Sequence, residues 1–322
     1  MRSIDKTINI NKLYNKELKL EYIKEKNQEA VLPSNYLENQ FFKVSEMERE
    51  LDKDVSNFTV YEIIEYFKLL NLTSLESLKV MTSEFSMYTQ WCLQKSLVTD
   101  NQNHFLEMSN DILMCCINKA VLSMKIISRE TILSWVNQLP NPKDQFVLLG
   151  LFEGLKGKDF CELAKLKPED IDDNIAHLCT GRDIEISDKL IEIIDDCMKE
   201  DQYYSITGNG TKVTKLADNG YIIKDYPNAR MDVSEFQIGR KIYNGVTRTL
   251  NYFDVLKYMS ANSIAEAGKI HMIKERASEL NISNKDYIYS DYISEVEKKF
   301  NSKIVRSLFW KKYEDYLDVK KV

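Results

Sequence analysis

Residues 148–172 read LLGLFEGLKGKDFCELAKLKPEDID, and this segment carries the most specific pattern in the sequence. Its first part is apolar enough for a buried helix, which we expect to begin near Asp144. A Gly-Leu-Lys-Gly turn at 154–157 ends that helix, and a second, amphipathic helix leads to Pro-Glu-Asp-Ile-Asp. The turn presents Lys156, which either holds a phosphate at the start of the following helix or is an ordinary loop lysine.

The sequence before this segment is predicted to be helical. Glycine (10) and proline (5) are scarce in 322 residues, which favours long helices over a sheet with many turns. Apolar residues recur every three or four positions in five segments, which are one that starts at Pro33-Ser34 and those at 60–71, 75–98, 104–119 and 128–137. Asn57 or Thr59 is expected to cap the second of them. Pro140 and Pro142 then interrupt the helical pattern, so we place a domain boundary at 138/139.

The sequence after residue 172 contains one predicted β region. Tyr203–Tyr226 alternates apolar and polar residues, and Gly208-Asn209-Gly210 and Asn219-Gly220 mark turns between short strands. The helical period returns from Asp232 and continues nearly to the end.

Composition excludes several classes of protein. Hydrophobic residues make up 43% and charged residues 29%, which is typical of globular domains. The sequence has no run of 18 apolar residues and opens with charged residues, so we expect neither a membrane span nor a signal peptide, and a cytoplasmic location. The six cysteines form no CxxC pair, the three histidines have no partners at the spacing of a triad or metal site, and no phosphate-binding loop is present. No metal or other cofactor is implied.

Charge is distributed unevenly along the chain. The net charge of −6 argues against a general binder of polyanions. Between Arg240 and Arg276, however, seven basic residues and His271 accompany only three acidic residues. This segment is either a surface for phosphate contacts or a solvated helical face, and the spacing favours neither.

The segment at 148–172, the β region and SANSIAEAGKI at 260–270 together resemble the tyrosine recombinases and phage integrases. The pattern is most similar to the lytic-cycle master repressors of SPβ-type phages, which resemble inactive recombinases. The resemblance implies a mainly α fold in three parts. These are an N-terminal arm (1–33), a helical core-binding-like, SAM-like domain (34–138) and a recombinase-like domain with a small antiparallel sheet (139–322).

The resemblance also assigns the positions of the family's catalytic residues. Lys156 stands at the first arginine, and Asn262 and Ala265 stand at the histidine and second arginine of His-x-x-Arg. The hairpin lysine is Lys212 or Lys215. Tyr313 or Tyr316 is available as the nucleophile, unless Phe300 fills that position. The set is therefore degenerate, and no catalytic residue is assigned.

These observations predict a sequence-specific DNA-binding repressor that does not cleave DNA and that silences the lytic genes of a prophage. The residues expected to contact DNA are Lys156, Lys158, Lys212, Lys215, Arg240, Lys241, Arg248, Lys257, Lys269, His271, Lys274 and Arg276. The expected partners are a double-stranded operator, a second copy through the C-terminal residues 300–322, and an antirepressor protein. An active recombinase and a helical protein-interaction module remain as alternatives.

Overall fold

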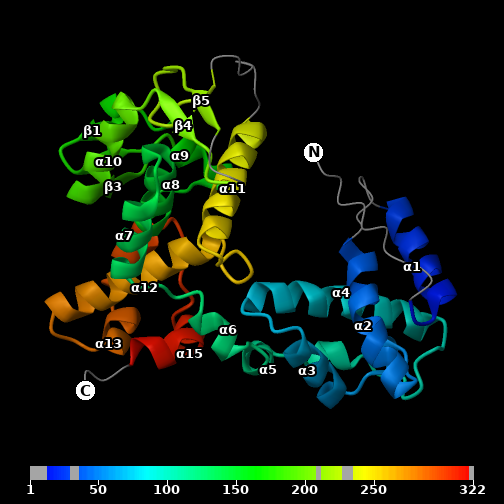
Figure 1. Ribbon diagram of the computed structural model, residues 1–322. Helices are drawn as coiled ribbons and strands as arrows, with labels where there is room; N and C mark the ends of the chain where they lie inside the picture. The colour runs from blue at the N-terminus through cyan, green and yellow to red at the C-terminus, as the bar shows by residue number, and fades with distance from the viewer. Residues whose placement is uncertain (1–12, 30–35, 208–211, 227–234, 319–322) are drawn as a thin grey trace. The chain divides into compact units, whose positions relative to one another are not determined.

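A computed structural model describes residues 13–29, 36–207, 212–226 and 235–318. The chain forms two compact units, Met1–Leu122 and Ser123–Val322 (Figure 1). Helices dominate both units, and the second also holds two small antiparallel sheets. The predicted fold class, mainly α with a small antiparallel sheet in the C-terminal part, is confirmed.

The first unit is a helical bundle around an aromatic core. Its elements are α1 (Lys16–Glu29), α2 (Tyr36–Leu51), η2 (Val55–Asn57), α3 (Val60–Leu69), α4 (Leu75–Gln94), η3 (His104–Glu107), α5 (Asn110–Cys115) and α6 (Lys119–Ser123). Tyr88 of α4 lies edge-on to Tyr22 of α1 and to Phe41 of α2, with ring centroids 5.1 and 4.8 Å apart. These contacts join the first, second and fourth helices in one core.

Helix α1 belongs to this bundle, although the sequence suggested a separate arm over residues 1–33. The Lys19 ammonium of α1 forms an ion pair with the Glu48 carboxylate of α2, and both side chains are fully buried. Glu48 also accepts a hydrogen bond from the backbone N–H of Val55 at 2.8 Å. A buried charge pair needs such additional bonds to offset its loss of hydration, and this pair joins α1 to α2. Residues 1–12, 30–35 and the predicted helix start at Pro33-Ser34 lie outside the described residues.

Side-chain caps set the helix starts that the sequence predicted. Thr59 caps α3, Ser74 caps α4 and Ser128 caps α7 (Arg129–Gln138), each by accepting a hydrogen bond from a backbone N–H three residues ahead. The single helix expected over 104–119 is wrong. The chain there forms η3, α5 and the start of α6, because Ser109 adopts an extended conformation and caps a new helix.

The second unit is built around α8 (Pro142–Phe152). This helix packs against α7, α10 (Asp188–Lys199), α11 (Glu235–Tyr252) and α12 (Ala261–Glu279). Gly268 permits α12 to pack closely on α8, because a Cβ atom there would lie 1.7 Å from the carbonyl oxygen of Phe152. The remaining helices are η4 (Lys158–Phe160), α9 (Cys161–Lys165), η5 (Pro168–Asp170), α13 (Asn284–Tyr289), α14 (Ile293–Lys299) and α15 (Arg306–Leu317).

Two sheets flank the helical core of this unit. Strands β1 (Ile171–Asp172), β2 (Ile175–His177) and β3 (Asp183–Glu185) form an antiparallel sheet, in which Ala176 pairs with Ile171 and Ile184. Strands β4 (Gln202–Tyr204) and β5 (Val213–Lys215) form the second, which lies in the predicted β region. The alternation of residues did not reveal β1–β3, because two or three residues are too few for a period of two. The predicted turn at Gly208-Asn209-Gly210 is not among the described residues.

The units divide at 122/123, whereas the sequence suggested 138/139. Pro142 is the first residue of α8, a position that suits proline because its missing N–H has no helical partner. Helix α7 packs on α8 and so belongs to the second unit. The two prolines therefore mark a helix start inside this unit.

Candidate nucleic-acid interface

The turn after α8 holds Lys156 in contact with the start of α12. Gly154 and Gly157 adopt φ values of 98° and 65°, which favour glycine, and they shape the turn. The Lys156 ammonium donates a hydrogen bond to the side-chain oxygen of Asn262 at 2.5 Å. Two positions 106 residues apart in sequence, which the resemblance placed in one site, therefore lie together. Burial, and then the charge of nearby Lys269, lower the pKa of Lys156.

The buried carboxylate of Glu162 holds this turn in place. The side chain of Glu162 in α9 is fully buried and accepts a hydrogen bond from the backbone N–H of Lys156 at 2.9 Å. Arg182, just before β3, donates to both oxygens of Glu162 at 2.9 and 2.6 Å. The same guanidinium also donates to the carbonyl oxygens of Lys298 and Lys299 at the end of α14. Arg182 therefore connects the Lys156 turn, the sheet and the C-terminal helices.

The remaining degenerate positions lie along α12 and α15. Ala265 is half-buried and supplies no charged group one turn after Asn262. Tyr313 of α15 is 1% exposed, and burial together with a hydrogen bond to Glu266 raises the pKa of its hydroxyl. Tyr316 is half-buried. The phenol of Tyr313 therefore faces the interior of the unit.

Helix α11 presents a cationic and amide-rich face to solvent. Its apolar side buries Ile242, Val246 and Leu250. The exposed cationic and amide side chains of the other side are Gln237, Arg240, Lys241, Asn244, Arg248 and Asn251. At 3.6 residues per turn, the two arginines and the lysine fall within an arc of about 100°. No acidic residue occurs between positions 236 and 253.

Three other predicted contacts lie near this face. Gly239 of α11 packs against the backbone of Asp159, next to the exposed Lys158. Lys212 and Lys215, at strand β5, are also exposed. Lys241 forms an ion pair at 2.5 Å with Asp225, which pairs through its backbone with Ala217 just after this strand. Lysines of the turn and the hairpin thus accompany α11.

The predicted cations of α12 do not share one surface. Lys269 is 7% exposed, and its ammonium bonds to Glu266 and Ser302 at 3.0 Å each, so the structure does not offer it as a surface contact. Burial lowers the pKa of His271, which keeps the ring neutral at physiological pH. Arg276 bonds to Glu279 at 2.8 Å. Sequence spacing missed these differences because consecutive residues of a helix point in different directions.

His271 and Arg276 instead line a pocket of about 250 Å³ between α8, β3 and α12. Arg129 and Lys299 also line this pocket, together with four glutamates: Glu153, Glu185, Glu275 and Glu279. The last two predicted contacts, Lys257 in the loop before α12 and Lys274 within it, are exposed.

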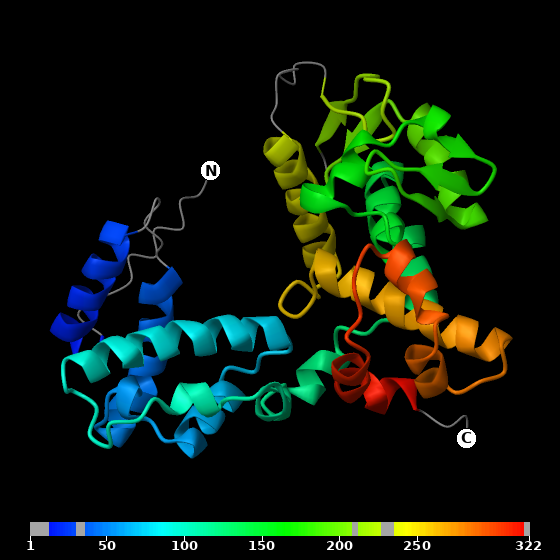
Figure 2. The same ribbon diagram turned by 180° about the vertical axis from the view of Figure 1, so that it is seen from behind.

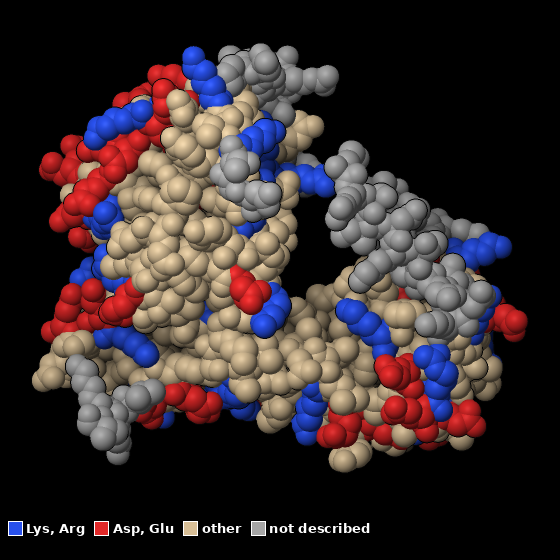
Figure 3. All heavy atoms as spheres, viewed as in Figure 1, with Lys and Arg blue, Asp and Glu red and all other residues tan. Residues whose placement is uncertain are grey.

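Acidic residues are concentrated away from α11. In this unit, α11 lies on the side opposite β1–β3 and α10 (Figure 1; Figure 2). Between Glu169 and Asp201 the sequence has twelve acidic and three basic residues. Figure 3 shows these acidic side chains gathered along the edge formed by β1, β3 and α10. The rest of the chain has 41 basic and 38 acidic residues, so the negative net charge originates from this edge.

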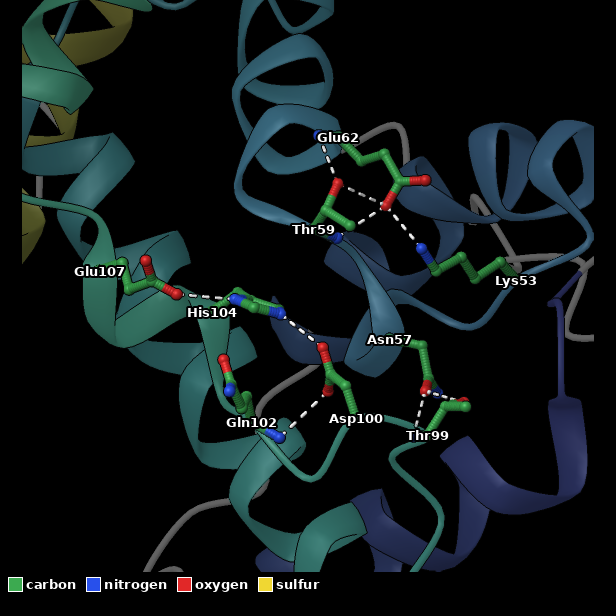
Figure 4. Close-up of polar contacts among 9 residues, drawn as sticks. All are labelled: Lys53, Asn57, Thr59, Glu62, Thr99, Asp100, Gln102, His104 and Glu107. Atoms are coloured by element: carbon green, nitrogen blue, oxygen red, sulfur yellow. Dashed lines mark hydrogen bonds and ion pairs between the residues drawn. The ribbon is translucent and has the colours of Figure 1, made fainter.

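The histidine of the first unit has acidic partners that the sequence pattern did not reveal. His104 lies between Glu107 and Asp100, with each ring nitrogen 2.7 Å from a carboxylate oxygen (Figure 4). The bonds to Glu107 and then Asp100 raise the pKa of His104. Glu107 lies three residues after His104 and Asp100 lies four residues before it, so the arrangement is a local structural contact. No group of three or more potential ligands that could hold a metal ion occurs in the part of the chain that the structure describes.

The chain consists of a helical unit followed by a unit in which a Gly-Leu-Lys-Gly turn contacts the start of α12. This is the organisation of the tyrosine-recombinase-like proteins. The sequence matches the MrpR N-terminal core-binding domain over residues 13–94 and the MrpR C-terminal catalytic domain over residues 126–322. The chain therefore belongs to the MrpR family. The predicted resemblance to recombinases, and to this group among them, is confirmed.

One curated relative and several solved structures are similar to the chain. The SPbeta prophage-derived uncharacterized protein YopR of Bacillus subtilis (strain 168) is 21% identical over 305 residues, which cover 90% of this chain and 91% of YopR. A lambda integrase(75-356) dimer bound to a COC' core site gives a TM-score of 0.41 at 12% identity, covering 95% and 98% of the two chains. The Tn1549 transposon integrase in complex with circular intermediate DNA gives a TM-score of 0.43 at 10% identity, covering 90% of this chain and 94% of the integrase chain.

Across the described segments, none of the helices combines the length and the apolar composition that a bilayer crossing requires.

Proposed function

We propose that this protein is a sequence-specific DNA-binding repressor that uses a recombinase-like fold without cleaving DNA. The exposed face of α11 is the observation that carries the proposal. Arginine and lysine neutralise phosphates, and arginine, asparagine and glutamine can donate paired hydrogen bonds to base edges in the major groove. A helix of 18 residues that displays such groups, with no acidic residue after its first residue, Glu235, suits a duplex.

The separation of charge supports the same proposal. A protein with a net charge of −6 repels DNA on average, but its field near α11 is set by nearby cations. The acidic edge over β1, β3 and α10 lies on the opposite side of the unit and orients the molecule with α11 toward DNA. Lys158, Lys212 and Lys215 extend this surface and would position the helix through backbone phosphates.

The absence of cleavage is inferred from four positions. Cleavage by the mechanism of the tyrosine recombinases needs two arginines around the phosphate. In this chain Lys156 lacks the guanidinium fork and Ala265 has no charge. Asn262 cannot act as a general acid or base. The hydroxyl of Tyr313 is buried and bonded to a carboxylate, which does not suit an attack on DNA. Loss of a single donor to a transition-state charge typically costs about 10²–10³ in rate, and several are missing here.

The similarity to a prophage-derived relative supports a role in lysogeny, in which the protein silences lytic genes from an operator in the host cytosol. Self-association through α15 and release by an antirepressor protein complete the proposal. An active recombinase and a helical interaction module are the competing functions.

Fluorescence anisotropy with labelled fragments of the encoding genome tests the proposal. We expect saturable binding to a small set of fragments that excess unrelated DNA does not displace. The affinity should fall steeply between 50 and 200 mM salt, by roughly 10³-fold for about six phosphate contacts. Absence of binding at low salt would refute DNA binding and favour the interaction module, whereas equal affinity for every fragment would refute sequence specificity.

A further inference from the structure

Two cysteines of the second unit are in direct contact. The thiol of Cys179 donates to the backbone carbonyl oxygen of Cys161 at 3.5 Å, and the two sulfur atoms are close enough to share a hydrogen bond. Cys161 is partly exposed and Cys179 is exposed, whereas Cys92, Cys116 and Cys197 are buried. Solvent oxidants therefore have access to this pair.

The surrounding structure already holds the two backbones together. Cys161 is the first residue of α9, and Cys179 lies in the loop between β2 and β3. Glu162, next to Cys161, accepts hydrogen bonds from Thr180 at 2.6 Å and from Arg182. These bonds hold the loop that carries Cys179 beside the start of α9. A disulfide needs Cα atoms within about 7 Å of each other, which a bond between Cys161 and Cys179 requires of this contact.

We propose that Cys161 and Cys179 form a reversible disulfide when the protein meets hydrogen peroxide. Cys161 attacks one peroxide oxygen, which breaks the O–O bond, gives a sulfenic acid and releases the first water. The Cys179 sulfur then attacks the Cys161 sulfur, and the hydroxyl leaves as the second water with the Cys179 proton. Two thiols and one peroxide thus give one disulfide and two waters, with the peroxide reduced and both sulfurs oxidised.

The atoms balance equally if Cys179 is oxidised first. Burial, and then the neighbouring Cys161, raise the pKa of Cys179 to about 11, so its thiol is protonated at neutral pH and releases that proton when its sulfur bonds to the Cys161 sulfur. Thiols of a reducing cytosol reverse the bond.

The disulfide ties the Lys156 turn to the β2–β3 loop. Cys161 lies against this turn, because a Cβ at Gly157 would come within 2.5 Å of its sulfur. Closing the loop between residues 161 and 179 restricts the unfolded chain, and the folded contacts already exist. The oxidised unit should therefore melt about 5 °C higher than the reduced unit.

The test is peroxide treatment of the folded full-length protein, alkylation of the remaining thiols and mass spectrometry. Trypsin cleaves at Lys165, which separates the two cysteines. We expect a protein lighter by two hydrogen atoms and a linked pair of peptides that contain Cys161 and Cys179. Dithiothreitol should reverse both the link and the rise in melting temperature.

Single serine variants provide matched controls. Cys161→Ser and Cys179→Ser should each abolish the link and the rise in melting temperature, whereas Cys115→Ser, which removes an exposed thiol of the first unit, should preserve both. Oxidation of Cys179 to a sulfinic acid with no linked peptides in the wild-type protein would overturn the proposal. So would a link that joins two chains. Neither readout involves DNA, so the result is independent of the proposed function.

Discussion

Replacing Arg182 with alanine should lower the free energy of unfolding of the second unit by about 3–5 kcal/mol, the usual cost of leaving one partner of a buried ion pair alone. The Glu162 side chain is 0% exposed and would lose two of its hydrogen bonds, while Lys298 and Lys299 would lose a donor to their carbonyl oxygens. Urea unfolding followed by tryptophan fluorescence measures this free energy. A Trp91→Phe background leaves Trp135 and Trp310, so the signal comes from the second unit.

Two further variants serve as comparisons for the loss of stability in Arg182→Ala. Arg182→Lys retains the charge but cannot donate to Glu162 and the two carbonyls together. Its free energy of unfolding should therefore lie between those of Arg182→Ala and the wild-type protein. Lys189→Ala removes an exposed ion pair with Glu192, and should change stability by less than about 1 kcal/mol. If Arg182→Ala costs no more than Lys189→Ala, Arg182 does not join the turn, the sheet and the C-terminal helices as described.

Reversing two charges on α11, with Arg240→Glu and Arg248→Glu together, should weaken DNA binding by about 100-fold or more, since each direct bond to a base or phosphate contributes about 1–3 kcal/mol. Both side chains are exposed, and because Arg248 also bonds to the hydroxyl of Tyr203, the folding of the variant has to be checked directly. The salt dependence should also become shallower, by about 0.9 in the logarithmic slope for each phosphate that the variant no longer neutralises.

The matched control changes the net charge equally at the other side of the unit. Lys189→Glu and Lys199→Glu on α10 lie on the acidic edge, pair with their own helix and should alter affinity only about 2- to 3-fold through the long-range field. Circular dichroism verifies that both variants are folded. If the two double variants lose affinity equally, binding depends on net charge and α11 is not the interface.

Local chemistry explains which parts of the fold could be predicted from sequence. Thr59, Ser74 and Ser128 fix helix starts by bonds to residues three positions away, so their effect is visible within a short window. The short strands β1–β3 are stabilised by pairing and packing rather than by their own alternation, and α1 is held by a buried pair 29 residues apart. Neither leaves a periodic signal.

The candidate site was predictable only in part for a related reason. The proximity of Lys156 to Asn262 was anticipated from the resemblance, because no spacing rule connects residues 106 positions apart. The sequence does not reveal the role of Arg182, since its partners come from α9, α14 and the turn after α8, and only the folded chain brings them together. The sequence predicts Lys269 as a DNA contact, since its burial comes from packing against Ser302 and Glu266, which the spacing of residues does not show.

The central claim is that this chain binds DNA without cutting it, and trapping of covalent adducts tests that claim most directly. The fragment bound in the anisotropy experiment is incubated with the protein and run in parallel on native and denaturing gels. The proposed function predicts a salt-sensitive shift on the native gel and no protein-linked DNA on the denaturing gel. A covalent adduct that disappears in Tyr313→Phe or Tyr316→Phe would contradict the claim and establish an active recombinase.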